Sequence, residues 1–447
     1  MGIFKAYDIR GIYPEEINEA AIYKIGKVFS EIFNAKNILV GRDMRTSSNS
    51  LVKALINGLT DSGAVVTNAG LVDTPMFYFC AKDYEAGLMV TASHNPKQYN
   101  GLKIVGKGLK PISYEGGLNI IEEKIGKLEI NEEECLKNAA KQTSKDVVVK
   151  DFMPKFIAFN LGFSDGIKKM KIVIDAANGM GGLTFPAVFK KIKNLDFECM
   201  YENPDGNFPN HEANPLKEEN LKDLKKEVVN KKADIGIAPD GDADRVIFID
   251  ETGRSVGADL AAALIAQNIL EEHPGSTILY DLRSSNIVKE IVESKGGKAL
   301  MCRVGHSYIK GQMRKDNAIF AGEVSGHLYF RENTYAESSI IASLAIMKLM
   351  SKTGKKLSEL IAPLRKYYQS GEINFQVKDK DAKMEELEKI FYDGKTSHLD
   401  GIRIDFDDFW FNARASNTEP VLRLNLEAKT EAKMLDMKNR ISKIITN

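Results

Sequence analysis

The sequence predicts an α/β protein with three similar domains, mixed and mostly parallel sheets, and a smaller C-terminal α+β domain. The first observation is a pattern that occurs three times, at 36–48, 171–182 and 276–286: an apolar strand ends in a polar loop, and a helical pattern follows. The second observation is that each of these strands is partnered later in the chain by another strand that also ends in a polar loop. This alternation of strands and helices favours parallel sheets.

The same patterns set the expected boundaries and the remaining elements. We expect four domains, at 1–150, 151–252, 253–366 and 367–447. The other expected elements are a helix ending near Phe33, a charged helical bridge at 128–149, a buried helix at 339–350, a charged helix at 381–391, strands near 400–411 and a terminal helix from Thr430.

The composition excludes several classes of partner. The 447 residues include 62 Lys and Arg and 62 Asp and Glu, so the formal net charge is zero. No global field draws the chain to nucleic acid or to an anionic membrane, and an anionic ligand must be held by local basic groups. The four cysteines are scattered, which suits a reducing cytosol. With no apolar N-terminal core and no apolar stretch long enough to span a bilayer, we expect a cytoplasmic protein.

The loop Thr91–Pro96 places a serine and a histidine just past an apolar strand. Open α/β sheets bind ligands at this carboxyl edge. Taken alone, Ser93 could be the nucleophile of a hydrolase with His94 as its base. Lys103, which follows soon after, could be a general acid or base if its pKa is lowered, although a surface lysine on a strand is the simpler interpretation.

The loop that begins at Asp240 carries the strongest chemical signal. Asp240, Asp242 and Asp244 alternate with small residues, a spacing that can bring three hard oxygen ligands to one Mg²⁺ ion. The spacing also fits an EF-hand calcium loop, but Arg245 replaces the required glycine and strands flank the loop. A solvated acidic turn is less favoured because three carboxylates repel one another. Arg245 could pair with one of them or with a substrate phosphate.

Two later loops carry weaker signals. Residues 322–327 include Glu323, Ser325 and His327, which could bind the hydroxyl groups of a polyol, although a turn that caps its own backbone fits equally. Residues 414–420 offer an arginine with hydroxyl and amide donors, which suits a phosphate dianion, although an ordinary turn before a strand also fits. Tyr7 and Arg10 fit a binding segment or a solvated strand end, and the lone His306 fits a structural role.

Taken together, the motifs TASHNP, DGDADR, GEVSGH and RASNTEP, with KAYDIRG near the N-terminus, resemble the α-D-phosphohexomutase superfamily. The likeness covers nearly the whole chain and favours the phosphomannomutase/phosphoglucomutase branch. It implies an active site in a central cleft and a Mg²⁺-dependent enzyme that interconverts hexose 1-phosphate and hexose 6-phosphate, with mannose or glucose as the sugar. It also implies glucose or mannose 1,6-bisphosphate as intermediate or activator.

The resemblance assigns a role to each candidate residue. Ser93 is the phosphoserine and completes the Mg²⁺ ligands Asp240, Asp242 and Asp244, while Arg245 faces it and His94 lies beside it. Lys103 and His306 match positions linked to acid–base work. The substrate-binding set is Tyr7, Arg10, Arg283, Glu323, Ser325, His327, Arg414, Ser416, Asn417 and Thr418.

The sequence leaves the preferred sugar open. Asn417 favours the phosphomannomutase/phosphoglucomutase branch over phosphoglucosamine mutases, which carry SGTEP, whereas Ala336–Ser339 departs from the Asp/Gly-rich stretch expected there. The alternatives are a phosphatase, a phosphoglucosamine mutase, or a catalytically silent protein that binds sugar phosphates. We expect a small phosphosugar as the partner, no nucleic acid or membrane, and a monomer or homo-oligomer.

Overall fold

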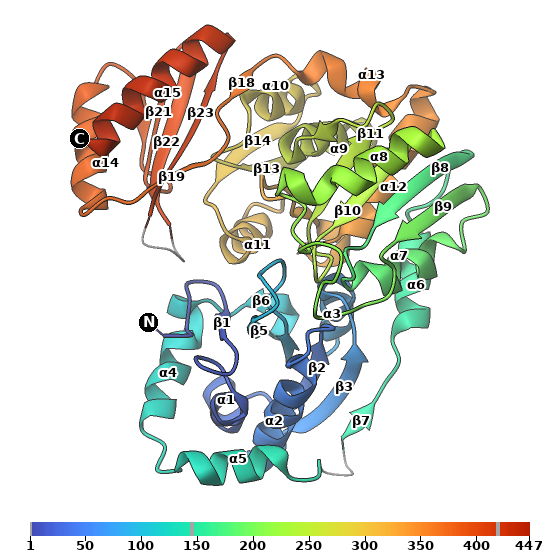
Figure 1. The fold of residues 1–447 in the computed structure, drawn as a ribbon, viewed down its shortest axis with the longest axis vertical. Helices are drawn as coiled ribbons and strands as arrows, with labels where there is room; N and C mark the ends of the chain where they lie inside the picture. The colour runs from blue at the N-terminus through green and yellow to red at the C-terminus, as the bar shows by residue number, and fades with distance from the viewer. Residues whose placement is uncertain (1, 144–146, 417–420) are drawn as a thin grey trace. The chain divides into compact units, whose positions relative to one another are not determined.

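The computed structural model describes residues 2–143, 147–416 and 421–447 (Figure 1). The chain forms two compact units. The first contains Met1–Val256 with Ser325–Leu357, and the second contains Gly257–Val324 with Ser358–Asn447. Within the described residues, every helix is too short or too polar to cross a lipid bilayer.

The first unit begins with a mixed sheet in the order β1-β5-β4-β2-β3-β7, with β6 paired to β5. Its strands are β1 (Ile9–Ile12), β2 (Asn37–Arg42), β3 (Val65–Leu71), β4 (Ala86–Val90), β5 (Tyr99–Gly106), β6 (Lys110–Pro111) and β7 (Val148–Val149). Its helices are α1 (Glu19–Phe33), α2 (Ser48–Asp61), α3 (Thr74–Ala81), α4 (Asn119–Gly126) and α5 (Glu132–Ala140). Helix α1 begins where Asn18 accepts a hydrogen bond from the amide of Ala21, which satisfies one free donor of the first turn. Figure 1 shows α1 and α2 side by side, in contact with α5.

A second sheet in the same unit has the order β12-β11-β10-β8-β9. Its strands are β8 (Met170–Asp175), β9 (Leu195–Met200), β10 (Ile235–Pro239), β11 (Val246–Asp250) and β12 (Ser255–Val256), and its helices are α6 (Met153–Leu161), α7 (Gly181–Phe189) and α8 (Lys222–Lys231). Strands β10 and β11 form an antiparallel hairpin, so strands rather than helices flank the loop that begins at Asp240. The hairpin β16 (Leu328–Phe330) and β17 (Ala336–Glu337) precedes the buried helix α12 (Ser339–Thr353).

The second unit contains a parallel arrangement and an antiparallel sheet. Strand β13 (Thr277–Asp281) pairs in parallel with β14 (Lys298–Cys302) and β15 (Phe320–Gly322). The nearby helices are α9 (Ala258–Glu272), α10 (Asn286–Ser294), α11 (His306–Lys315) and, at the division between the units, α13 (Leu357–Ile361).

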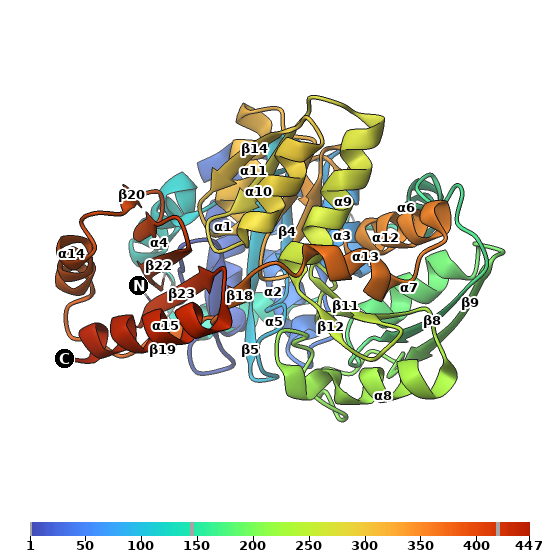
Figure 2. The same ribbon diagram turned by 90° about the horizontal axis from the view of Figure 1, so that it is seen from above.

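The C-terminal sheet is antiparallel and has the order β18-β23-β22-β21-β20, with β19 paired to β23. Its strands are β18 (Tyr368–Gln369), β19 (Ile373–Phe375), β20 (Lys395–Ser397), β21 (Ile402–Asp405), β22 (Phe409–Ala415) and β23 (Leu422–Ala428). Helices α14 (Lys380–Ile390) and α15 (Glu431–Thr446) supply apolar side chains to its core. Figure 2 shows α15 along this sheet, which confirms the predicted C-terminal α+β domain.

The paired strands predicted from the sequence are present. Strand β2 pairs in parallel with β4, β8 with β10, and β13 with β15. The serine loop follows β4, the loop that begins at Asp240 follows β10, and the loop that contains Glu323 follows β15. The three α/β domains therefore present their polar loops at equivalent strand ends, as the sequence predicts.

Candidate active site

The serine loop directs the side chain of Ser93 toward Asp240. Ser93 is 2 % exposed and has a left-handed backbone with φ of 49°. Its hydroxyl donates a hydrogen bond to Oδ2 of Asp240 at 2.8 Å, whereas Nδ1 of His94 lies 3.4 Å from Oγ. The backbone amide of Ser93 donates to Oγ1 of Thr91 at 3.0 Å. The hydroxyl is therefore presented to the acidic loop rather than to its neighbouring histidine.

A single buried arginine holds the serine loop in place. The guanidinium of Arg45 donates hydrogen bonds to the carbonyl oxygens of Ser93 at 2.8 Å, Asn95 at 2.6 Å, Pro96 at 2.8 Å and Tyr99 at 2.9 Å. Arg45 is 1 % exposed. Four bonds to backbone groups fix the path of the loop whatever its side chains do. Arg45 is therefore a positioning residue for Ser93.

Two glycines let other chain segments approach closely, one the Ser93 loop and the other the loop that carries Arg45. A Cβ on Gly241 would lie 2.5 Å from the carbonyl oxygen of Ser93, and one on Gly206 would lie 2.6 Å from the backbone nitrogen of Thr46, next to Arg45. Real Cβ atoms do not approach so closely, so the two loops meet backbone to backbone.

The predicted acidic triplet is assembled and buried. Asp240, Asp242 and Asp244 are at most 2 % exposed and each offers a carboxylate oxygen within 4.8 Å of the others. Burial and the charges of the other two aspartates raise the pKa of Asp240. Within the described residues, Oδ1 of Asp242 is buried without a hydrogen-bond partner. Three clustered carboxylates with a spare oxygen fit a divalent cation with hard-oxygen preference, as Mg²⁺ has.

Lys103 neutralises part of this triplet. Its ammonium group lies 2.7 Å from Oδ2 of Asp242 and also contacts Asp244. Burial acts to lower the pKa of Lys103, but the two aspartates raise it well above its usual range. Burial acts to raise the pKa of Asp244, but Lys103 and His327 hold it well below its usual range. The lowered pKa that a lysine base needs is not found here, and the raised pKa also makes Lys103 a weak proton donor, so its ammonium group serves as a counter-charge to the two aspartates.

Arg245 and His327 close the other side of the acidic loop. The two residues form an antiparallel backbone bridge, and Nε of Arg245 donates to Nε2 of His327 at 3.1 Å. The same Nε lies 3.7 Å from Asp240, and Nε2 of His327 lies 3.3 Å from Asp244. Nδ1 of His327 contacts the Ser325 hydroxyl at 3.0 Å. Ser325 and His327 thus belong to the surroundings of the acidic loop.

The stretch that departs from the family pattern also reaches this loop. Glu337 joins Asp244 and His327 in a second group whose ligand atoms lie within 4.8 Å of one another. The Ser339 hydroxyl donates to the carbonyl oxygen of Ala243 at 2.6 Å. Glu337 and Ser339 therefore lie beside the acidic loop.

The N-terminal segment meets the serine loop through Arg10. Nη1 of Arg10, on β1, donates to the side chain of Asn95 at 2.8 Å, and Asp8 pairs with its other nitrogen. Tyr7 precedes β1 and is half-buried.

Burial, with the nearby charges of Arg245 and Arg10, lowers the pKa of His94 well below its usual range, so its imidazole is neutral at pH 7.

In the second unit, Arg283 and Glu323 lie together. Arg283 follows β13, and its Nη2 lies 2.8 Å from Asp281 and 3.3 Å from Glu323. Burial acts to lower the pKa of Arg283, but these carboxylates raise it above its usual range. Glu323 thus contacts Arg283, whereas Ser325, two residues later, belongs to the first unit.

The predicted phosphate-binding loop is described in part. Arg414 is the second-to-last residue of β22 and is 2 % exposed. The backbone amide of Ser416 donates a hydrogen bond to the carbonyl oxygen of Val421 at 2.9 Å. Asn417 and Thr418 lie outside the described residues. Glu372 contacts Arg414 at 3.4 Å. His306 is the first residue of α11.

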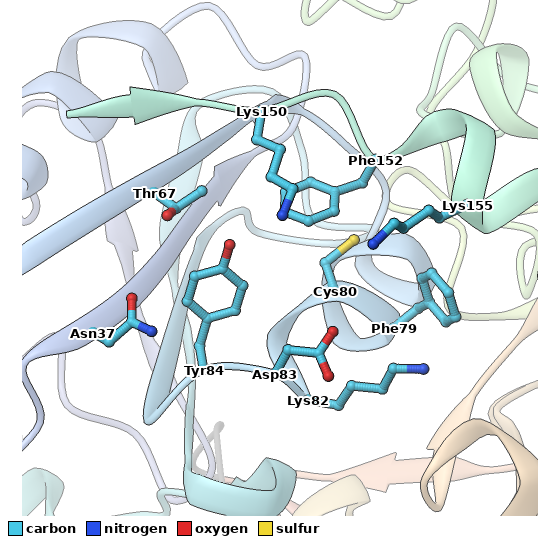
Figure 3. Close-up of a pocket in the computed structure, with 10 residues that line it drawn as sticks. All are labelled: Asn37, Thr67, Phe79, Cys80, Lys82, Asp83, Tyr84, Lys150, Phe152 and Lys155. Atoms are coloured by element: carbon cyan, nitrogen blue, oxygen red, sulfur yellow. The ribbon is translucent and has the colours of Figure 1, made fainter.

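A separate cavity of about 430 Å³ lies at the amino ends of β2 and β4, the opposite strand ends from the serine loop (Figure 3). It is lined by Asn37, Thr67, Phe79, Cys80, Lys82, Asp83, Tyr84, Lys150, Phe152 and Lys155. The lining contains no site residue predicted from the sequence, so this cavity is distinct from the candidate active site.

Sequence reasoning missed several residues that the structure places at the site. Arg45 and Thr74 are separated from the motifs they support, and Thr74 Oγ1 donates to Asp242 Oδ2 at 2.6 Å. Glu337 and Glu372 also went unassigned. Arg45 had a usable signal, because it lies in a polar loop that follows a predicted strand.

Comparison with known families covers nearly the whole chain. Profiles described as phosphoglucomutase/phosphomannomutase match at residues 1–131 for domain I, 150–253 for domain II, 258–367 for domain III and 372–444 for the C-terminal domain.

Individual relatives agree. The chain is 42 % identical to a protein named phosphomannomutase from Methanocaldococcus jannaschii, over 99 % of this chain and 98 % of the relative. It is 38 % identical to a protein named phosphohexose mutases from Xanthomonas campestris, over 98 % and 97 %. A phosphoglucomutase/phosphomannomutase family protein from Burkholderia thailandensis superposes with a TM-score of 0.85 at 29 % identity, over 99 % of this chain and 96 % of that chain. The chain therefore belongs to the phosphoglucomutase/phosphomannomutase family and is an intramolecular phosphotransferase acting on hexose phosphates.

Proposed function

We propose that this chain is a Mg²⁺-dependent phosphohexomutase that interconverts hexose 1-phosphate and hexose 6-phosphate, with mannose or glucose as the sugar. The phosphoryl group would be carried by Ser93, and the intermediate would be a bisphosphorylated hexose. The observation that carries the proposal is the 2.8 Å hydrogen bond from Ser93 to Asp240, inside a buried triplet of aspartates. Relatives named phosphomannomutase support mannose as one of the sugars.

Asp240, Asp242 and Asp244 would hold the Mg²⁺ ion together with a phosphoryl oxygen on Ser93. A bound Mg²⁺ would supply positive charge that neutralises the phosphoryl group during transfer. Arg245, at the edge of the triplet, adds a second positive charge on the side of Ser93. Phosphoryl transfer depends mostly on positioning and charge neutralisation, so these groups suffice for the central chemistry.

In the first transfer, the bond between phosphorus and Ser93 Oγ would break and a bond to a sugar hydroxyl oxygen would form, while the proton of that hydroxyl would pass to Ser93 Oγ. In the second transfer, the bond between the other phosphate and its sugar oxygen would break, a bond to Ser93 Oγ would form, and the Ser93 proton would pass to the sugar oxygen. Lys103 would act as a fixed positive charge beside Asp242 and Asp244, because these carboxylates raise its pKa, and the neutral His94 would add no charge beside Ser93. The intermediate then turns and returns its other phosphate to Ser93.

Turning requires a separate grip on the phosphate that is not transferred. Arg414, Ser416, Asn417 and Thr418 would form this clamp, with Arg283 beside it, because guanidinium groups and hydroxyl donors match phosphate oxygens. Glu323 and Ser325 would bind sugar hydroxyls, and Tyr7 and Arg10 would bind substrate from the N-terminal segment.

A coupled assay with mannose 1-phosphate, glucose 1-phosphate and glucosamine 6-phosphate tests the proposal. Turnover of the first two without accumulation of free phosphate would support it. Preference for glucosamine 6-phosphate would assign a phosphoglucosamine mutase, phosphate release would assign a phosphatase, and binding without turnover would assign a silent binding protein. Mass spectrometry of the intact protein, with one phosphate on Ser93, is the independent check.

A further inference from the structure

The carboxylate of Glu372 lies among three arginines of the second unit. Glu372 directly precedes β19. Its Oε2 accepts from Nη1 of Arg283 at 3.5 Å and from Nη2 of Arg414 at 3.4 Å, and its Oε1 lies 3.2 Å from Nη1 of Arg423. The side chain of Glu372 is 28 % exposed, whereas those of Arg283 and Arg414 are 8 % and 3 % exposed. The partly exposed carboxylate of Glu372 therefore contacts the buried guanidinium groups of Arg283 and Arg414 and the more exposed guanidinium group of Arg423.

This arrangement resembles the way in which proteins hold a phosphate. Several guanidinium groups converge on one small anion, and their planar sets of donors match its oxygens. Burial lowers the pKa of Arg414, and so does the like charge of Arg283 nearby. Nε of Arg414 is also buried without a hydrogen-bond partner in the described part of the chain. Glu372 thus offsets part of the positive charge of the cluster, together with Asp281 and Glu323 at Arg283, but it leaves Nε of Arg414 unused.

We infer that Glu372 is an internal competitor for the substrate phosphate. Its carboxylate holds the arginines together while the clamp is empty, and it is displaced when a phosphate dianion binds. This inference rests on the proposed function, because it takes Arg414 as part of the phosphate clamp.

Displacement has a direct consequence for affinity. A phosphate that enters the cluster must break the three contacts of Glu372 and then remain close to its negative charge, which opposes binding. The clamp therefore holds phosphate less tightly than its arginines alone would. A weaker grip suits a cycle in which the bisphosphorylated sugar must be released, turned and bound again by its other end.

The test is the isosteric substitution Glu372→Gln, with inorganic phosphate as the probe in isothermal titration calorimetry of the full chain. Because the charge that opposes the dianion is removed at a partly exposed position, we expect the dissociation constant to fall about tenfold. With hexose phosphate as substrate, KM should fall and kcat should fall too, because release becomes slower. Glu388→Gln is the matched control, since Glu388 is a partly exposed carboxylate of the same unit that pairs with His398.

The outcomes separate the inference from the proposed clamp. Unchanged or weaker phosphate binding in a folded Glu372→Gln protein, checked by thermal unfolding, would overturn the competitor role and leave Glu372 as a residue that only positions the arginines. An equal gain in Glu388→Gln would also overturn it, because the effect would then come from net charge. Arg414→Ala is measured in parallel. If it leaves phosphate binding intact, the clamp assignment itself fails, whatever Glu372 does.

Discussion

Ser93, on the loop after β4, and Arg414, near the end of β22, belong to different compact units, and the two residues are held by different kinds of contact. The Ser93 loop is fixed through its backbone, by four carbonyl hydrogen bonds to Arg45 and by the close approach of Gly241. The guanidinium of Arg414 is held through a side chain, by an ion pair with the partly exposed Glu372. Ser93, the proposed carrier of the phosphoryl group, is thus placed by contacts that substrate cannot replace, whereas Arg414 of the proposed phosphate clamp uses a contact that a phosphate can take over.

The largest expected effect comes from Ser93. Ser93→Ala removes the oxygen that would carry the phosphoryl group, so we expect turnover to fall by roughly 10⁴-fold or more, as for the loss of other covalent nucleophiles. Steady-state assays with mannose 1-phosphate measure this. Ser164→Ala is the control and should be fully active, because Ser164 follows α6 and its hydroxyl donates to the carbonyl oxygen of Leu161. Near-normal turnover of a folded Ser93→Ala protein would exclude the covalent mechanism.

Removal of the metal ion should lower the activity about as strongly as the loss of the Ser93 hydroxyl. Chelation of divalent cations leaves three buried carboxylates without the charge that neutralises the phosphoryl group, so we expect activity to fall to background and to return when Mg²⁺ is added. Calorimetric titration of Mg²⁺ gives a second measurement, in which Asp242→Asn should bind the ion more weakly. Full activity after chelation would show that the triplet has another role.

The clamp should respond mainly in substrate affinity. Arg414→Ala removes a charge-assisted hydrogen bond to the phosphate that is not transferred, worth about 1.5–3 kcal/mol, so KM should rise roughly tenfold to a hundredfold. Unfolding temperature should change little. The control is Arg440→Ala, whose guanidinium lies over the ring of Phe391. An unchanged KM in Arg414→Ala would remove the clamp assignment.

For Arg45 we expect a smaller effect, which should fall on kcat rather than on KM. Lysine cannot reach four carbonyl oxygens at once, so Arg45→Lys should loosen the Ser93 loop and lower kcat about tenfold while KM stays nearly constant. Arg42→Lys, at the end of β2, is the matched control. If Arg45→Lys changed KM and left kcat intact, Arg45 would act in binding, and the contrast between the two loops would disappear.

The sequence predicted those parts of the fold and site that depend on short contiguous patterns. The strand-and-loop pattern located β2, β8 and β13 and their later partners, and Asp240, Asp242 and Asp244 share one turn. Arg45 lies in a polar loop after a predicted strand, but the Ser93 loop that it holds is distant in sequence within the same domain. Thr74 and Glu337 lie beside the acidic loop, which is also distant from them in sequence, and a local pattern encodes none of these pairings.

Some assignments depend on charges that only a folded structure brings together. The sequence allows Lys103 to be a general acid or base with a lowered pKa, or a surface lysine, but it is buried and Asp242 and Asp244 raise its pKa. The structure also places Glu337 and Ser339 beside the acidic loop, which leaves the sugar preference untested. The domain boundaries, the roles of all the site residues, the Mg²⁺ ion and the cytoplasmic location stay predictions.

Gly206 and Gly241 have a consequence for domain exchange between relatives. Both belong to the chain segment of the second α/β domain, yet Gly241 leaves space for the Ser93 loop of the first domain and Gly206 leaves space for the backbone at Arg45, which holds that loop. A chimera that joins the first domain of this chain to the second domain of another protein should accept many surface differences. It must keep glycine at both positions, because a Cβ on Gly241 would meet the carbonyl oxygen of Ser93, and one on Gly206 would displace the backbone beside Arg45.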